Sequence, residues 1–327
     1  MNMKTKLLVC FGALLCVAAS SSPFGWPLAR LTVQVRNEDG EVVSGAKVQI
    51  NFRERLSDRD ARVVGETDRE GRFAGEGYSD RRLGATVTKE AYYDSGAGWT
   101  IFKDPILGKW QPWNPVAEVV LRPIGKPVLL AVKRVRTDVP VLDVPCGYDL
   151  QKGDWVAPYG KGAQSDFTFK VSRDYKDWFN FTVEAQVTFP QQLDGLLRMK
   201  APPYGRNSVF CWERNAPETG YVAPHAIRFV NHDPRTDQQP ERTFDLTKER
   251  EQGYFFRVRT VEENGKIIAA HYGKITGDIG IEPRDSKTCQ ISFTYYFNPA
   301  ALDRNVEWDP KRNLLPGLTF EETPQSP

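Results

Sequence analysis

The sequence has few of the residues from which catalytic and metal sites are usually built. Only 3 His and 5 Cys occur among its 327 residues. His225 and His232 lie seven residues apart, which on one strand places their side chains on opposite faces. Neither Cys-x-x-Cys, Gly-x-Ser-x-Gly nor His-Glu-x-x-His occurs. The sequence therefore predicts no catalytic residue, no metal ligand and no cofactor.

The cysteines are also too scattered for a disulfide framework. Cys146, Cys211 and Cys289 lie beyond the first 22 residues, and we predict that they are buried, unpaired thiols acting as small apolar side chains. Export would permit a bridge between two of them, so the sequence leaves their pairing open. Cys211 precedes His225 in the sequence, but a core thiol is the simpler interpretation because spacing alone does not make a thiol reactive.

Long apolar runs are missing after the N-terminus. There, Lys4 and Lys6 precede an apolar run at residues 7–19, and small residues follow as far as Ser22. This layout predicts a signal peptide over residues 1–22, cleaved after one of residues 19–22, and hence a secreted or periplasmic protein. The alternative is an N-terminal anchor, although the run is shorter than the ~20 residues that span a bilayer. After cleavage we expect no integral membrane segment.

Neither sign of charge is in excess. The chain has 44 Lys and Arg against 42 Asp and Glu, and loss of the two lysines in the predicted leader leaves 42 of each. A nucleic-acid partner requires a basic surface that neutralises phosphates. We therefore predict no nucleic-acid partner, and the sequence does not determine the oligomeric state.

Alternation of apolar and polar residues dominates the rest of the chain, and it is typical of half-buried strands. The longest example covers residues 179–189, with apolar side chains at every second position and polar ones between them. Residues 31–35 and 47–52 alternate in the same way. Asn264-Gly265 predicts a tight hairpin turn between strands at 253–262 and 266–275, and a further strand is expected at 289–296. The fold class predicted is all-β.

Prolines divide the chain into two parts. Pro123, Pro127 and Pro140 interrupt a stretch that otherwise has strand-like positions at 128–135, and each proline removes one ladder donor. We predict a β-sandwich over residues 30–122, a linker or shared strand at 123–137, and a larger all-β domain, a sandwich or jelly roll, at 138–322.

Five short segments of the first part follow one another in a recognisable order. A strand at 31–35 runs into the turn Asn-Glu-Asp-Gly at 37–40, and Gly-Ala at 45–46 leads the next strand. Thr-Asp-Arg-Glu-Gly-Arg-Phe follows at 67–73, and Lys-Glu-Ala-Tyr-Tyr at 89–93. In this order they resemble the carboxypeptidase-regulatory-like family, whose patterns are T-D-x-x-G-x-F and K-x-G-Y. The resemblance implies a transthyretin-like β-sandwich that is a non-catalytic accessory module.

The turns of this pattern carry specific expectations. Gly40 and Gly71 are expected to supply positive φ angles, and Asp39 and Asp68 to accept hydrogen bonds from backbone two residues on. The chain departs from the family pattern at Val42, where proline is frequent, and at Ala91, where glycine is found. The larger part resembles an uncharacterised domain of exported bacterial proteins, which implies no function.

Loop aromatics give the best indication of function. Tyr92, Tyr93, Trp99, Trp110 and Trp113 cluster in a stretch rich in Gly, Pro and Asn. Such rings stack on sugars or anchor protein partners, and their alternative role is to pack inside the protein. We predict an exported, non-catalytic binding or structural protein with a glycan or cell-envelope partner. A secreted carbohydrate-active hydrolase with two paired carboxylates is the alternative.

Overall fold

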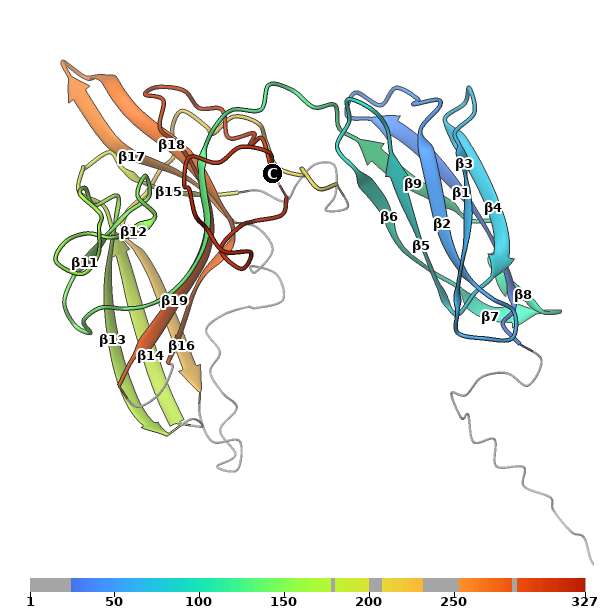
Figure 1. Ribbon diagram of the computed structural model, residues 1–327, viewed down its shortest axis with the longest axis horizontal. Helices are drawn as coiled ribbons and strands as arrows, with labels where there is room; N and C mark the ends of the chain where they lie inside the picture. Colours follow the sequence, from blue (N-terminus) through green and yellow to red (C-terminus); the bar gives the residue numbers. More distant parts are fainter. Residues whose placement is uncertain (1–24, 178–179, 200–207, 232–252, 284–286, 327) are drawn as a thin grey trace, which may run out of the picture. The chain divides into compact units, whose positions relative to one another are not determined.

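The computed structural model describes residues 25–177, 180–199, 208–231, 253–283 and 287–326. The predicted leader, Phe179 and His232 lie outside these residues. All of the regular structure described is β-strand, so the predicted all-β, sandwich-like class is confirmed (Figure 1). The described part also holds no helix long and apolar enough to cross a bilayer.

The chain forms two compact units. Unit 1 comprises Met1–Arg36, Val42–Val87 and Gly96–Val119, and unit 2 comprises Asn37–Glu41, Thr88–Ser95 and Val120–Pro327. Three short segments of the range expected for the first module, residues 37–41, 88–95 and 120–122, therefore belong to unit 2. The stretch expected as a linker or shared strand contains β10 (Ala131–Asp138), which pairs with β19 (Cys289–Asn298) in unit 2.

Unit 1 is built on a nine-stranded sheet with the order β6-β5-β2-β4-β1-β8-β7, in which β3 also pairs with β2 and β9 with β1. Its core is lined by the alternating residues expected from the sequence, because Leu31, Val33, Val48 and Ile50 are all fully buried. The strands are β1 (Leu28–Asn37), β2 (Lys47–Arg53), β3 (Asp60–Glu66), β4 (Arg72–Tyr78), β5 (Arg82–Thr88), β6 (Ser95–Ile101), β7 (Lys103–Ile106), β8 (Lys109–Gln111) and β9 (Val116–Leu121).

The turns of the family-like pattern mostly have the expected geometry. Gly40 and Gly71 have φ angles of 83° and 73°. Asp68 Oδ1 accepts a hydrogen bond from the Glu70 amide at 3.0 Å. For the first turn the expectation was wrong: Asn37 Oδ1, not Asp39, is the side-chain acceptor, and it bonds the Asp39 amide at 3.0 Å. Asn37 precedes the turn, so its short side chain reaches the amide two residues on.

Ala91 occupies a left-handed conformation, with φ at 64°, at the position where the family pattern has glycine. An L-residue with a Cβ pays a steric penalty there that glycine avoids. We expect Ala91→Gly to raise the free energy of unfolding by about 1 kcal/mol, because relief of this strain exceeds the entropy that glycine adds to the unfolded chain. Urea denaturation measures the change. The same substitution at Ala97, which has no positive φ, should destabilise instead, and a loss of stability at both sites would contradict the argument.

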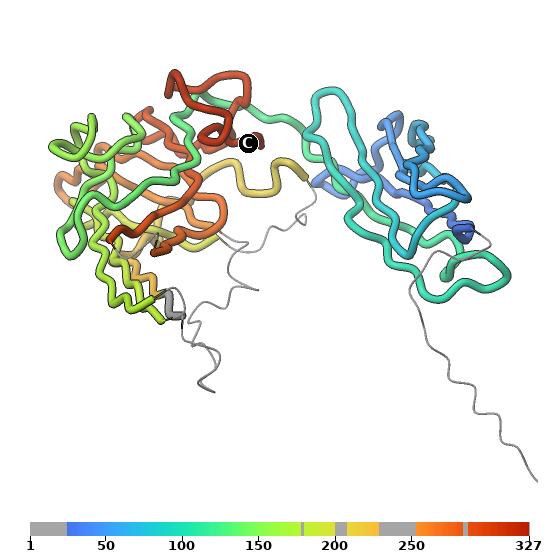
Figure 2. Tube along the Cα trace, turned by 60° about the horizontal axis from the view of Figure 1, so that its bottom comes forward, coloured from blue at the N-terminus to red at the C-terminus, as the bar shows by residue number. Residues whose placement is uncertain are grey.

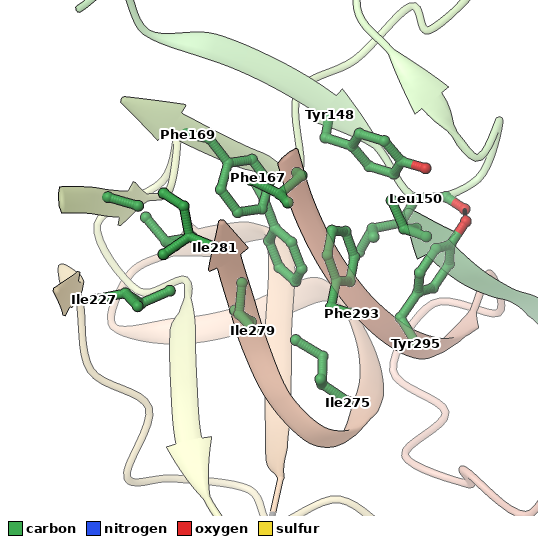
Figure 3. Packing of buried hydrophobic residues seen from close by; sticks show 14 of the residues in the cluster. Tyr148, Leu150, Phe167, Phe169, Ile227, Ile275, Ile279, Ile281, Phe293 and Tyr295 are labelled. Carbon is green, nitrogen blue, oxygen red and sulfur yellow. Dashed lines mark hydrogen bonds between the residues drawn. The ribbon is translucent and has the colours of Figure 1, made fainter. Parts of the chain in front are cut away.

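Unit 2 contains two five-stranded sheets, ordered β10-β19-β18-β17-β15 and β12-β11-β13-β14-β16. Side chains from both sheets form one core cluster, in which Phe167 and Phe169 of one sheet meet Phe293 of the other (Figure 3). The remaining strands are β11 (Cys146–Asp149), β12 (Asp154–Trp155), β13 (Phe167–Asp177), β14 (Asn180–Thr188), β15 (Gly195–Arg198), β16 (His225–Asn231), β17 (Tyr254–Glu263) and β18 (Lys266–Pro283).

Residues 180–188 of the long alternating segment form β14, which runs antiparallel to β13. The two strands lie side by side in the yellow-green part of the tube in Figure 2. The apolar residues Phe181, Val183, Ala185 and Val187 of β14 are 5%, 0%, 4% and 0% exposed, as predicted. The hairpin between β17 and β18 turns at Asn264 and Gly265, both with positive φ. Unlike β14, β19 is buried on both faces. One face lies in the main core cluster of unit 2, and the other lies in a smaller cluster in which Tyr296 contacts Trp308.

Candidate binding site

The structure separates the five predicted aromatics. Trp99, Trp110 and Trp113 lie in unit 1, whereas Tyr92 and Tyr93 belong to unit 2. The sequence cluster is therefore not one site within either unit. Each ring has to be judged by its own contacts.

Two of the five rings are built into the interior. Trp110 is 8% exposed, donates from Nε1 to the Ser79 carbonyl at 2.8 Å, and stacks on Phe102. Tyr93 is buried, and its hydroxyl donates to Glu307 Oε1 at 2.8 Å. Burial, followed by the bond to Glu307, raises the pKa of Tyr93. These contacts give both rings a structural role.

Two more rings are partly covered. Tyr92 is half-buried and forms a β-bridge with Pro123. Trp113 is half-buried, and the Lys109 ammonium lies 4.9 Å from the centre of its ring. Neither presents a broad open face.

Trp99 is different, because 71% of it is exposed. It lies on β6, an end strand of the sheet order, and Ile101, two residues on, is 64% exposed on the same face. A Cβ placed on Gly84 of β5 would lie 3.5 Å from Cζ3 of Trp99. The indole thus rests over a stretch of backbone that has no side chain, which holds it against the sheet while leaving it open to solvent.

Polar side chains surround this ring. The Arg82 guanidinium lies 5.9 Å from its centre. On β5 and β2 the residues facing away from the core alternate with buried ones, so they share the outer face with Trp99. Gln49 and Asn51 are joined there by a 2.9 Å hydrogen bond. We call this surface the Trp99 face; its residues are Lys47, Gln49, Asn51, Arg82, Gly84, Thr86, Trp99 and Ile101.

The carboxylates that come together in unit 2 are held by internal bonds. Arg259 pairs with Asp166 at 2.7 Å and with Asp149 at 3.3 Å. Asp149 also accepts from the amides of Gln151, Lys152, Ala163 and Gln164. Burial raises the pKa of Asp166, and its bond to Arg259 opposes that shift. The two acids tie the loop after β11 to the sheet, and this arrangement gives the hydrolase alternative no support.

Metal ligands do not converge in the described residues, where no group of three or more His, Cys, Asp or Glu side chains could hold an ion. Burial lowers the pKa of both His225 and His271. Cys146, Cys211 and Cys289 are thiols. Cys146 and Cys289 are buried as predicted, but Cys211 is only half-buried, because it lies at the margin of a small cluster of apolar residues rather than inside it.

Sequence reasoning missed a buried lysine in unit 2. Lys274 of β18 is 0% exposed, and its Nζ makes no hydrogen bond to the described residues. Its ammonium lies 4.7 Å from the ring centres of both Phe210 and Tyr296. Burial lowers the pKa of Lys274 to about 7. Lys274 lies on the same face of β18 as Ala270 and Tyr272, which are both buried. This alternation was the available signal that Lys274 is buried too.

Glu38 and Glu307 organise the rest of this region of unit 2. Glu38 pairs with Arg122 and Arg214, each at 2.9 Å. Glu307, 1% exposed, accepts from the Tyr93 hydroxyl and from the Gly125 and Lys126 amides. The cluster fixes the segments 37–41, 88–95 and 120–126 within unit 2, and its role is structural.

Comparison with known proteins identifies no relative: no protein-family model and no curated protein matches the chain. The fold and the site thus define an all-β protein of sandwich-like architecture in which, among the described residues, Trp99 forms a solvent-facing platform.

Proposed function

We propose that this chain is an exported, non-catalytic binding protein whose Trp99 face holds a sugar ring of a cell-envelope glycan. In this proposal unit 1 is a transthyretin-like module of the kind that the carboxypeptidase-regulatory-like pattern implies. The observation that carries it is the 71% exposed indole of Trp99, supported from beneath by the backbone at Gly84. An indole held in this way loses little conformational freedom on binding.

The chemistry of the surface suits a saccharide. The apolar C–H face of a pyranose packs against an aromatic ring, and a few polar groups around the ring then fix its orientation. Arg82 can donate to ring hydroxyls, and the amides of Gln49 and Asn51 can both donate and accept. β6 itself carries no charged residue, whereas Lys47 and Arg82 on the neighbouring strands are cationic, so the surface suits a neutral or an anionic sugar ring.

Trp99→Ala should abolish most glycan binding. Removing a central aromatic contact weakens an interface by about 2 kcal/mol or more, which is roughly 30-fold in Kd. A glycan array identifies the ligand, and titration calorimetry with the best oligosaccharide measures the loss.

Phe320→Ala is the matched control. Phe320 is an 80% exposed aromatic residue of unit 2, and its loss should leave glycan affinity unchanged. Far-UV circular dichroism should be the same for all three proteins, because neither ring is part of a core. Binding that survives in Trp99→Ala, or an array without any ligand, would refute the proposed site.

A further inference from the structure

The hairpin formed by β7 and β8 exposes two adjacent apolar side chains at its tip. Ile106 is 62% exposed and Leu107 is 97% exposed, the highest value among the large apolar side chains that the structure describes. Leu107 and Gly108 form the turn with φ angles of 50° and 76°. Such turns favour Asn, Asp or Gly, and a leucine there is strained. A strained and fully exposed leucine points to a function rather than to stability.

The base of the hairpin is anchored to unit 1 by packing and hydrogen bonds. Trp110 and Phe102 stack beneath it, and Trp110 Nε1 bonds the Ser79 carbonyl. The Leu28 amide donates to the Gly108 carbonyl at 2.8 Å, so the turn is tied to the start of β1. The two side chains therefore project from a rigid support.

A second exposed leucine lies at the same end of unit 1. Leu56 is 80% exposed, in the loop between β2 and β3. The Trp26 amide donates to the Arg55 carbonyl at 2.9 Å. Residues 26–28 thus connect this loop to the turn of the hairpin, and Figure 1 shows β7 and β8 beside the beginning of β1.

The chain that precedes Gly25 indicates what covers this end. Its apolar run at residues 7–19 is joined to Gly25 by only five residues, which span about 20 Å at most. A leader of this kind enters a membrane during export. Until the leader is cleaved, the end of unit 1 that carries Leu56, Ile106 and Leu107 is therefore tethered within about 20 Å of the bilayer.

The residues flanking the tip fit a lipid interface. Lys103 and Lys109 are exposed on either side of the turn, with Asp104 as the acid between them, and the Lys109 ammonium lies over Trp113. Apolar residues bordered by lysine and tryptophan are typical of segments that enter the headgroup region.

We propose that unit 1 docks on a lipid bilayer through this hairpin after export. Ile106 and Leu107 enter the boundary between headgroups and acyl chains, and Leu56 adds a third contact. Lys103 and Lys109 remain at the level of the phosphates. The proposal does not depend on glycan binding by the Trp99 face.

The test is flotation of the exported protein, with its N-terminus confirmed by sequencing, on vesicles of phosphatidylcholine alone or with phosphatidylglycerol. Wild type should float with both. The double variant Ile106→Thr/Leu107→Asn should lose at least tenfold in partition coefficient, since each buried aliphatic side chain contributes about tenfold. Asparagine suits a positive φ, so this variant should fold at least as well as wild type.

Val116→Thr, an exposed apolar position of β9 in unit 1, and Trp99→Ala serve as controls that should float like wild type. Equal flotation of the double variant would overturn the proposal. So would a wild-type protein that stays in the soluble fraction, which would assign the tip to a protein partner instead.

Discussion

Replacing Lys274 with methionine should stabilise the protein at neutral and acidic pH. The lysine is fully buried and has no hydrogen-bond acceptor among the residues that the structure describes, and such a charge is costly to bury. Methionine has a similar volume and no charge to desolvate. We expect the free energy of unfolding at pH 6 to rise by roughly 2–5 kcal/mol, the two aromatic rings around the ammonium offsetting part of its burial.

The pH dependence gives the sharper test. The pKa of Lys274 is about 7 in the folded protein and about 10.4 in an unfolded chain. Between these values the unfolded chain binds the proton and the folded protein does not, so stability rises with pH. Below pH 7 both states are protonated, and the destabilisation is fully present. Wild type should therefore gain stability relative to Lys274→Met from pH 7 to pH 10, by up to about 1.4 kcal/mol per pH unit.

Guanidinium denaturation of wild type and variant at several pH values measures this difference. Cys211, Glu307 and Arg122 are the other groups that act electrostatically on Lys274 in wild type. Lys266→Met, at the exposed start of the same strand, should change neither stability nor its pH dependence appreciably. Two parallel pH profiles for wild type and Lys274→Met would show that the buried amine does not titrate as argued.

Phe181→Ala should have the next largest effect, a loss of about 3–5 kcal/mol. Phe181 is 5% exposed, belongs to the main core of unit 2 and stacks on Tyr175. Its truncation removes apolar burial and leaves a cavity that the surrounding strands fill only partly.

Gln186→Ala provides the comparison on the same strand. Gln186 is exposed on the opposite face of β14, and a surface change of this kind usually stays within ~0.5 kcal/mol. Denaturant midpoints of the two variants should therefore differ clearly. Similar losses at both positions would mean that the faces of β14 are wrongly assigned.

Local sequence patterns were sufficient to predict structure where a single physical requirement acts on neighbouring residues. Side chains on a strand alternate between faces, so the period of residues 179–189 was enough to identify the buried face of β14. Asn264-Gly265 tolerates positive φ, so the hairpin could be placed from two residues. Glycine at positions 40 and 71 likewise identified turns. In the first turn, however, the prediction of Asp39 as the capping side chain was wrong, because Asn37, two residues earlier, accepts the bond from the Asp39 amide.

The candidate sites needed the tertiary structure. Five aromatics that are close in sequence were expected to act alike, but Trp99 is exposed and Trp110 is buried. The difference depends on Gly84 and Ser79, on other strands. Exposure of a ring is set by what lies against it, and a one-dimensional pattern does not contain that neighbour.

The strand class, the alternating core positions and the tight turns could be predicted from the sequence alone, because each follows from backbone geometry over a few residues. Only the three-dimensional packing places Lys274 between Phe210 and Tyr296 and pairs Arg259 with Asp166 across 93 positions of the chain. It also assigned residues 37–41 and 88–95 to unit 2. These features arise from long-range packing, in which burial and charge pairing depend on partners that local periodicity does not specify.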